Sequence, residues 1–248
     1  MTDLVKMLVN FYKNDRMPLH MSDNGGPFGF DIHHALEVDY LIHAYGCDGI
    51  IETGTFFGDT TLYLAEMYPD IPIVSCELNP VFYEKAKERL SYSTQHNNLT
   101  LYNDSSEKVL RKILKKFNFP LIYLDAHFLS EEPFPISKEL REIKRGVVCI
   151  GDFFIGDASI RNYQIFGESQ SFQMVYHFDR LDGVNIDQIL VEKNIKTSTP
   201  IYVNNAANLG AYPLPCHQYT RRAGRGYFAM NTDQDLFKSC EFFMLPTY

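Results

Sequence analysis

From Asp48 onward, two patterns of apolar and polar residues follow each other along the chain. Short apolar runs of strand length are each followed by a longer segment with apolar residues at helical spacing. Repeated strand–helix units predict a parallel sheet covered by helices on both faces. The predicted strands are 48–52, 71–77, 99–103, 121–125 and 147–151, and the predicted helices are 60–67, 80–90, a segment after Ser106, and 137–144.

The later part of the chain is less regular but contains two more strand-like runs. Ile201–Asn204 and Tyr227–Met230 are short and apolar, and we expect them to form a final antiparallel pair. With the five parallel strands they predict a Rossmann-like α/β fold, in which a seven-stranded, mostly parallel sheet is the middle layer of a three-layer αβα sandwich.

The segment before the first predicted strand does not show the repeated strand–helix pattern. We treat residues 1–47 as an N-terminal extension and residues 48–248 as one α/β domain, a size that a single core supports. The stretch Gly25-Gly26-Pro27-Phe28-Gly29 cannot form a regular helix, because glycine and proline both disfavour it. It is a candidate lid or substrate loop.

Composition narrows the function classes. The 248 residues include 31 Asp and Glu against 23 Lys and Arg, which gives a net charge of −8. A chain with this negative charge binds nucleic acid poorly in general, because affinity for phosphate backbones comes largely from Lys and Arg. One basic cluster, Arg111–Lys116, alternates with apolar residues at helical spacing, so we interpret it as the solvated face of an amphipathic helix.

Cysteine usage and hydropathy indicate a compartment. The chain has five Cys, an odd number, and no Cys-x-x-Cys, while Cys76 and Cys149 fall inside apolar runs. This pattern is typical of buried free thiols in a reducing environment. The first residues lack the apolar run of a signal peptide, and no segment reaches membrane-spanning length. We therefore expect a cytoplasmic protein.

Polar residues stand at the carboxyl ends of the predicted strands, where an open α/β sheet binds its ligands. Gly54 and Gly58 let the backbone turn tightly and approach a ligand. Glu77 can accept hydrogen bonds from both hydroxyls of a ribose, and Asp104 suits the polar edge of an adenine. The residues at the five strand ends are Glu52-Thr53-Gly54-Thr55 with Gly58, Glu77, Asp104-Ser105, Asp125-Ala126-His127 and Asp152.

This succession resembles the motifs of class I S-adenosylmethionine-dependent methyltransferases over roughly residues 48–153. Within that class, Asp125-x-His127 with Asp152 is similar to the metal-dependent sugar O-methyltransferases of antibiotic and capsule pathways, such as those that methylate a heptose of a bacterial capsule. The resemblance implies an enzyme that uses S-adenosyl-L-methionine and a divalent metal (Mg, Mn or Fe) to methylate a sugar or nucleotide-linked sugar.

The resemblance also implies roles for single residues. Glu77 would hold the ribose, and His127 would be the general base or a third metal ligand. The residues implied in cofactor binding are Glu52, Thr53, Gly54, Thr55, Gly58, Glu77, Asp104, Ser105 and Asp125. Those implied in catalysis are His127 and Asp125, and those implied in metal binding are Asp125, Asp152 and His127.

Two positions depart from the family pattern. Phe56 stands where the first loop usually has another Gly, so we expect a loop of different shape. Gly151 stands where the metal-dependent relatives often carry an acid, which leaves the metal site one ligand short of the familiar set.

The implied chemistry explains why these groups are needed. Methyl transfer to an alcohol requires that the acceptor oxygen be aligned with the methyl donor and lose its proton. Alignment can contribute ~7–11 kcal/mol, and a positioned base about 10²–10⁴-fold in rate. A divalent cation lowers the pKa of a sugar hydroxyl, and a histidine such as His127 titrates near neutrality.

Other functions remain open on the sequence alone. The acceptor could be another small molecule or an RNA base, although the acidic charge disfavours RNA. The strand–helix order and Glu77 also fit a nicotinamide-dependent oxidoreductase, but the chain lacks G-x-G-x-x-G. A binding protein that kept the fold without the chemistry is a further alternative.

The basic cluster Arg221–Arg225 has two interpretations. It could clamp the phosphate of a nucleotide-linked sugar, because arginine binds phosphate in bidentate fashion. A solvated loop is the simpler interpretation, and we favour it. Whether the chain forms a homodimer is left open by the sequence.

Overall fold

The computed structural model of the protein describes most of the chain. The described residues are 3–13, 25–92, 97–126, 135–151, 153, 201–205 and 224–245.

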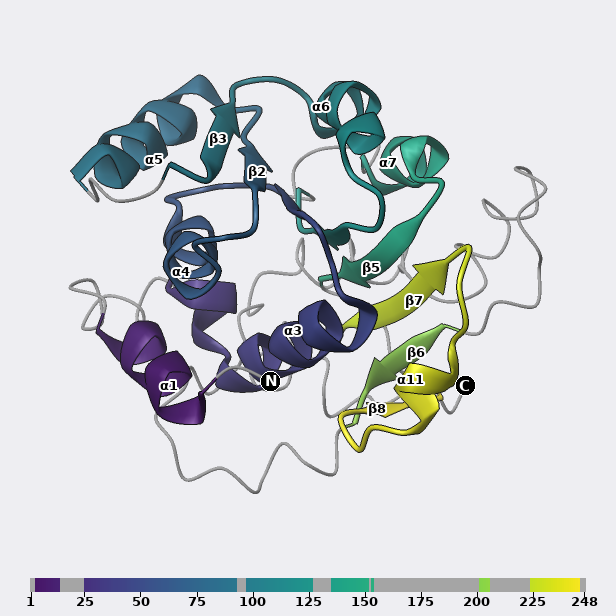
Figure 1. Ribbon diagram of the computed structural model, residues 1–248. Helices are drawn as coiled ribbons and strands as arrows, with labels where there is room; N and C mark the ends of the chain where they lie inside the picture. The colour runs from purple at the N-terminus through teal and green to yellow at the C-terminus, as the bar shows by residue number, and fades with distance from the viewer. Residues whose placement is uncertain are drawn as a thin grey trace, which may run out of the picture.

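One sheet forms the centre of the molecule, with its strands in the order β3-β2-β1-β4-β5-β7-β6-β8 (Figure 1). The first five in this order pair in parallel, and β7 pairs antiparallel with both β5 and β6. The strands are β1 (Ile50–Thr53), β2 (Ile73–Cys76), β3 (Leu99–Tyr102), β4 (Leu121–Leu124), β5 (Gly146–Ile150), β6 (Tyr202–Asn204), β7 (Gly226–Met230) and β8 (Phe243–Met244).

The α/β, mostly parallel sheet and the final antiparallel pair are confirmed, but the strand count is not. The sheet has eight strands rather than seven, because β8 pairs antiparallel with β6 at the edge. Two residues are too few to show the alternation that marks a strand, so this element has no signal in the sequence.

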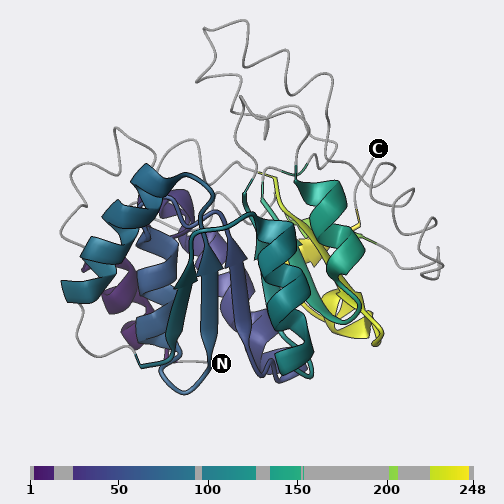
Figure 2. The same cartoon turned by 90° about the horizontal axis from the view of Figure 1, so that it is seen from above.

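Helices cover both faces of the sheet (Figure 2). Neighbouring strand residues face opposite layers: Ile50 and Val147 join one apolar cluster, and Ile51 and Val148 join the other. The first cluster packs on α1, α3, α4 and α11, and the second on α6 and α7. The bounds are α1 (Leu4–Tyr12), η1 (Pro27–Phe30), α3 (Ile32–Tyr45), α4 (Asp59–Met67), α5 (Pro80–Tyr92), α6 (Ser106–Ile113), η2 (Leu114–Lys116), α7 (Ile136–Glu142) and α11 (Asp235–Lys238).

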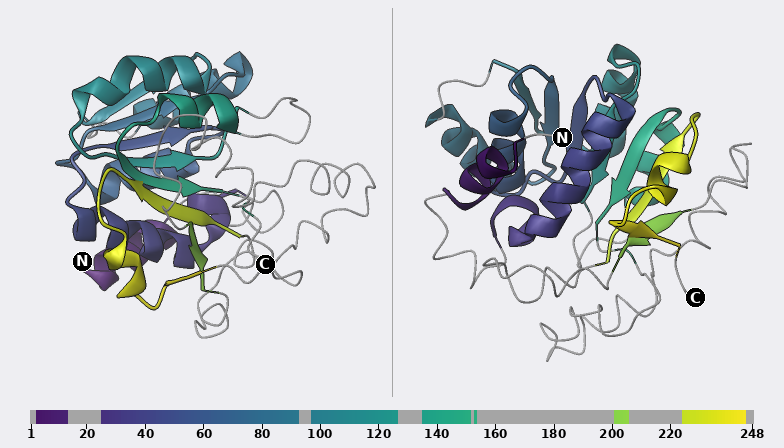
Figure 3. Two further views of the ribbon diagram at one scale, coloured as in Figure 1. Left: turned by 90° about the vertical axis from the view of Figure 1, so that its right-hand side faces the viewer. Right: turned by 60° about the horizontal axis from the view of Figure 1, so that its bottom comes forward.

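The described part of residues 1–47 contributes to the core. Helix α3 is buried along most of its length, and Figure 3 shows α1 and α3 on the same face of the sheet. The predicted loop region forms the short turn η1, in which Phe28 and Phe30 are buried and the Phe28 N–H donates to Thr60 Oγ1 at 2.8 Å. That this segment acts as a lid stays a prediction.

The predictions for the cysteines and for the basic cluster are confirmed for the described residues. Cys47, Cys76 and Cys149 are buried free thiols and Cys240 is a partly buried one, whereas Cys216 lies outside the described residues. Arg111 and its basic neighbours lie on the exposed face of α6 and η2. No helix in the described stretches is long and apolar enough to cross a membrane.

The interpretation of Arg225 as part of a solvated loop is wrong. Its side chain is 2% exposed and donates to Asp31 Oδ2 at 2.7 Å and to Glu37 Oε2 at 2.7 Å. Tyr227 also donates to Glu37. Burial raises the pKa of Glu37, and the Arg225 guanidinium opposes that rise. Arg221 and Arg222 lie outside the described residues.

Replacing Arg225 with alanine should destabilise the fold strongly. The change leaves the buried carboxylates of Asp31 and Glu37 without their cation, and we expect a loss of about 3–5 kcal/mol in the free energy of unfolding. Chemical denaturation at pH 7 measures it. Arg111→Ala is the control, because its ion pair with Glu142 is exposed on the arginine side and should cost less than about 1 kcal/mol. Equal losses in the two variants would contradict the role of Arg225.

Candidate functional site

The carboxyl ends of the central strands lie along one edge of the sheet, and backbone hydrogen bonds continue past the last strand residues. The N–H of Gly54 donates to Cys76 O at 2.9 Å, and that of Asp125 to Thr53 O at 3.2 Å. Glu77 N–H donates to Tyr102 O at 3.0 Å. These bonds place the residues after β1, β2, β3 and β4 side by side. The strand order reverses its direction between β1 and β4, because β2 and β3 lie on one side of β1 whereas β4 and β5 lie on the other. Open α/β sheets bind their ligands at this point.

The turn after β1 approaches the chain after β4 very closely. Gly54 has φ of +84°, and a Cβ built there would lie 2.4 Å from Asp125 O. A side chain at this position would collide with backbone that cannot move aside, so only glycine fits. Gly58, with φ of +78°, lies four residues further on and is the N-cap of α4.

The Glu77 carboxylate is held in place at the end of β2. Its Oε2 accepts from Phe56 N–H at 2.8 Å, and its Oε1 accepts from Asn79 N–H at 2.9 Å. Glu77 is partly exposed, and a carboxylate offers about four lone-pair sites, so both oxygens can accept further hydrogen bonds. The side chain is therefore oriented and still able to bind a ligand.

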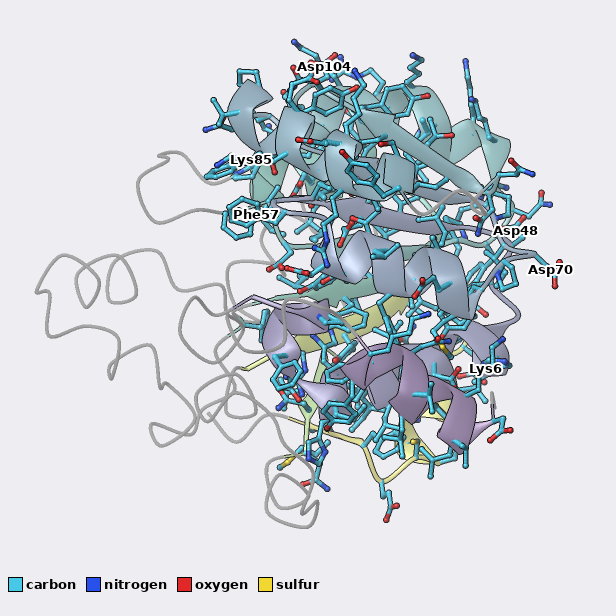
Figure 4. All side chains as sticks on the ribbon, turned by 90° about the vertical axis from the view of Figure 1, so that its left-hand side faces the viewer. Lys6, Asp48, Phe57, Asp70, Lys85 and Asp104 are labelled. Atoms are coloured by element: carbon cyan, nitrogen blue, oxygen red, sulfur yellow. The ribbon has the colours of Figure 1, made fainter. Side chains whose placement is uncertain are left out.

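Asp104 and Ser105 lie at the outer end of the same edge, before α6. The Asp104 carboxylate accepts from Ser105 N–H at 2.8 Å and from Lys108 Nζ at 3.3 Å, and these contacts lower its pKa. Figure 4 shows Asp104 at the surface. Asn103 joins this end of the edge to the previous strand, because its side chain donates to Glu77 O at 2.8 Å.

Asp125 is oriented by a tyrosine that the sequence pattern did not single out. Tyr123 Oη donates to Asp125 Oδ2 at 2.7 Å, and a Cβ at Gly151 would lie 2.4 Å from Asp125 Oδ1. The glycine at position 151 therefore leaves room for this carboxylate. A signal for the tyrosine exists in the sequence, because residues two apart in a strand point to the same side.

Three residues that the resemblance implied in cofactor binding face the interior instead. Glu52, Thr53 and Thr55 are each at most 4% exposed. Glu52 accepts from Ser75 Oγ at 2.5 Å and from the Thr61 hydroxyl, and Thr55 Oγ1 lies 2.6 Å from Ser75 Oγ. These buried side chains pack against the interior side of the turn after β1. We therefore propose no direct cofactor contact for the side chains of Glu52, Thr53 and Thr55.

The predicted metal site falls mostly outside the described residues. His127 and Asp152 are among the residues that the structure does not describe, so only Asp125 of the three implied ligands can be placed. Among the described residues, no group of three His, Cys, Asp or Glu could hold a metal ion.

Solved structures of known proteins share this architecture. An O-methyltransferase from Bacillus cereus in complex with SAH matches with a TM-score of 0.52 and 13% identity, over 92% of this chain and 97% of its own. A protein from Methanococcus maripaludis, assigned as an S-adenosyl-L-methionine-dependent methyltransferase, matches with a TM-score of 0.51 and 15% identity, over 94% and 97%. The chain has the Rossmann-like methyltransferase fold. At these identities the likeness concerns the fold alone.

No protein-family model and no curated protein matches the sequence. The evidence on the function of the chain therefore lies in the residues at the strand ends.

Replacing Glu52 with glutamine should change how stability depends on pH. Burial raises the pKa of Glu52 to about 8, so the folded state retains a proton that the unfolded state has lost above its own pKa near 4.5. The free energy of unfolding should therefore fall as pH rises through this window. For Glu52→Gln this decline is removed, and we expect the wild type to lose about 3–4 kcal/mol relative to it between pH 5 and pH 8.

Urea unfolding at several pH values measures the difference. Glu84→Gln is the control, because Glu84 is exposed on α5 and its replacement should leave the pH profile of the wild type unchanged. Parallel profiles for the wild type and Glu52→Gln would show that the buried carboxyl is not the titrating group.

Proposed function

We propose that the chain is an S-adenosyl-L-methionine-dependent methyltransferase. The observation that carries the proposal is the oriented, partly exposed Glu77 carboxylate at the end of β2, beside the Gly54 turn. The Bacillus cereus protein of the same fold is an O-methyltransferase in complex with SAH.

The residues at the edge suit the parts of this cofactor. Glu77 would accept hydrogen bonds from the ribose hydroxyls, and the close turn at Gly54 would give the methionine part access to the backbone. Asp104 and Ser105 lie at the end of the next strand and would contact the adenine. The bound cofactor supplies a methyl group already activated by the sulfonium, so the chain has to align the acceptor and take its proton.

The alternative of a nicotinamide-dependent oxidoreductase is less well supported. The dinucleotide-binding order 3-2-1-4-5-6 continues with a parallel sixth strand, whereas here the antiparallel β7 lies next to β5. The turn after β1 also lacks the third glycine of the dinucleotide fingerprint.

For the acceptor we propose a sugar hydroxyl, free or on a nucleotide-linked sugar in the cytoplasm. Support comes from the similarity of Asp125-x-His127 and Asp152 to sugar O-methyltransferases, and from the fixed orientation of Asp125. Asp125 holds the acceptor hydroxyl, and His127 takes its proton as general base. A non-sugar alcohol would use the same two groups, so a panel of acceptors is needed to separate the alternatives.

A divalent metal stays a prediction from the sequence. Asp125 is a hard oxygen ligand that suits Mg²⁺ or Mn²⁺, but a single described carboxylate does not make a site. We derive no catalytic step through a metal.

Cofactor binding can be tested without knowing the acceptor. We expect isothermal titration calorimetry to show binding of S-adenosylhomocysteine and no binding of NAD. Glu77→Gln should weaken binding of S-adenosylhomocysteine about tenfold or more, because hydrogen bonds to a charged acceptor are lost. The exposed Glu84→Gln should bind like the wild type. Binding of NAD alone would replace this proposal with the oxidoreductase.

Methyl transfer tests the catalytic assignment. With labelled S-adenosyl-L-methionine and pooled nucleotide-linked sugars, Asp125→Asn and His127→Ala should each lower the transfer rate at least about 10²-fold. Loss of the reaction on chelation with EDTA and its return with Mg²⁺ or Mn²⁺ would support the predicted metal, and full activity in EDTA would remove it. Transfer at the wild-type rate by both variants would remove Asp125 and His127 from the mechanism.

A further inference from the structure

Phe56 adopts a backbone conformation that bulky residues rarely occupy. Its φ is +50°, in the left-handed region that favours glycine. The phenylalanine thus takes a left-handed conformation that glycine would adopt without strain. Such a conformation is strained for a residue with a Cβ, and it persists only when surrounding contacts hold it. That the loop differs in shape from those of the family stays a prediction.

The backbone of Phe56 has a specific task in this conformation. Its N–H donates to Glu77 Oε2 at 2.8 Å, while Asn79 N–H at the start of α5 donates to Oε1 at 2.9 Å. One donor comes from the turn after β1 and the other from the segment after β2. The Glu77 carboxylate is thus fixed only while the turn and α5 keep their relative positions.

One face of α5 holds the turn in that position. The Phe82 ring lies 4.8 Å from the Phe56 ring and 5.5 Å from the Phe57 ring, and Lys85 Nζ lies 5.3 Å from the Phe57 ring centre. One turn further along, Arg89 donates to Phe57 O at 3.1 Å and pairs with Asp59. Residues three and four apart share a helix face, so these contacts act as one unit. Figure 4 shows Phe57 and Lys85 next to each other.

We propose that Phe56 is a positioning residue for the Glu77 carboxylate. Ring contacts between Phe56 and Phe82 of α5 hold the Phe56 N–H against Glu77. The ring supplies the tertiary contacts that stabilise the left-handed backbone. The carboxylate is therefore oriented before a ligand arrives. This inference rests on the proposed function only in taking the ligand of Glu77 to be S-adenosyl-L-methionine or its product.

The main variant is Phe82→Ala, which removes the partner ring without changing the turn's own sequence. In calorimetric titrations of S-adenosylhomocysteine we expect about tenfold weaker binding for Phe82→Ala than for the wild type. In a Glu77→Gln background the same change should weaken binding less than about twofold, because the carboxylate through which it acts is gone. Tyr83→Ala is the matched control, since the Tyr83 ring contacts Lys87 on the same helix.

Phe56→Gly separates positioning from stability. The glycine relieves the left-handed strain but removes the ring, so the midpoint of thermal unfolding should fall little or rise while binding of S-adenosylhomocysteine weakens about tenfold. Wild-type affinity in Phe56→Gly or Phe82→Ala, or an equal loss in the presence and absence of Glu77, would overturn the inference.

A ligand-free measurement keeps the inference apart from the proposed function. Amide hydrogen exchange should show the Phe56 N–H protected in the wild type and exchanging about tenfold faster in Phe82→Ala and Glu77→Gln. If the wild type does not bind S-adenosylhomocysteine but shows this pattern, the proposed function fails and the positioning role stands. An unprotected Phe56 N–H in the wild type would overturn the positioning role.

Discussion

The contact between the turn after β1 and the chain after β4 is the constraint on which the site depends. Gly54 and Asp125 meet backbone to backbone, and the hydrogen bonds of Gly54 and Thr55 to Cys76 O bind the same turn to β2. Because β1 lies between β2 and β4, its terminal turn fixes the residues that follow three strands. Strand pairing rather than a flexible loop therefore sets the positions of Glu77 and Asp125. The distance and orientation between the two carboxylates are fixed as a result.

Two buried polar clusters support this edge. Beneath the turn, Glu52 shares the hydroxyls of Ser75 and Thr61, and beside α3, Arg225 binds Asp31 and Glu37. Burial of ionisable groups costs free energy unless each has partners, and here the partners come from different elements. Both clusters therefore tie elements together: the first joins β1, β2 and α4, and the second joins the start of α3 to the start of β7.

Much of the fold and part of the site could be predicted from the sequence. Strand-length apolar runs indicated the parallel strands, and Asn79-Pro80 indicated the start of α5, because these signals are local. The positions of Gly54, Glu77, Asp104 and Asp125 followed from the rule for strand ends. The burial of Arg225 could not be predicted, since its partner carboxylates lie about 190 positions away in the sequence. The left-handed backbone of Phe56 depends on the Phe82 ring, and the inward direction of Glu52 depends on Ser75, so neither has a local signal.

The Arg225 cluster has a consequence for how the chain is made. A chain emerging from the ribosome presents Asp31 and Glu37 long before residue 225 has been synthesised, so α3 cannot take its final place against the sheet with its charges neutralised. The contact closes one of the longest loops in the molecule, and such contacts form late because the entropy of the intervening chain must be lost first. Docking of α3 with its charges neutralised thus has to wait until residue 225 is available, and until then chaperones can reach the apolar face of the sheet that α3 covers.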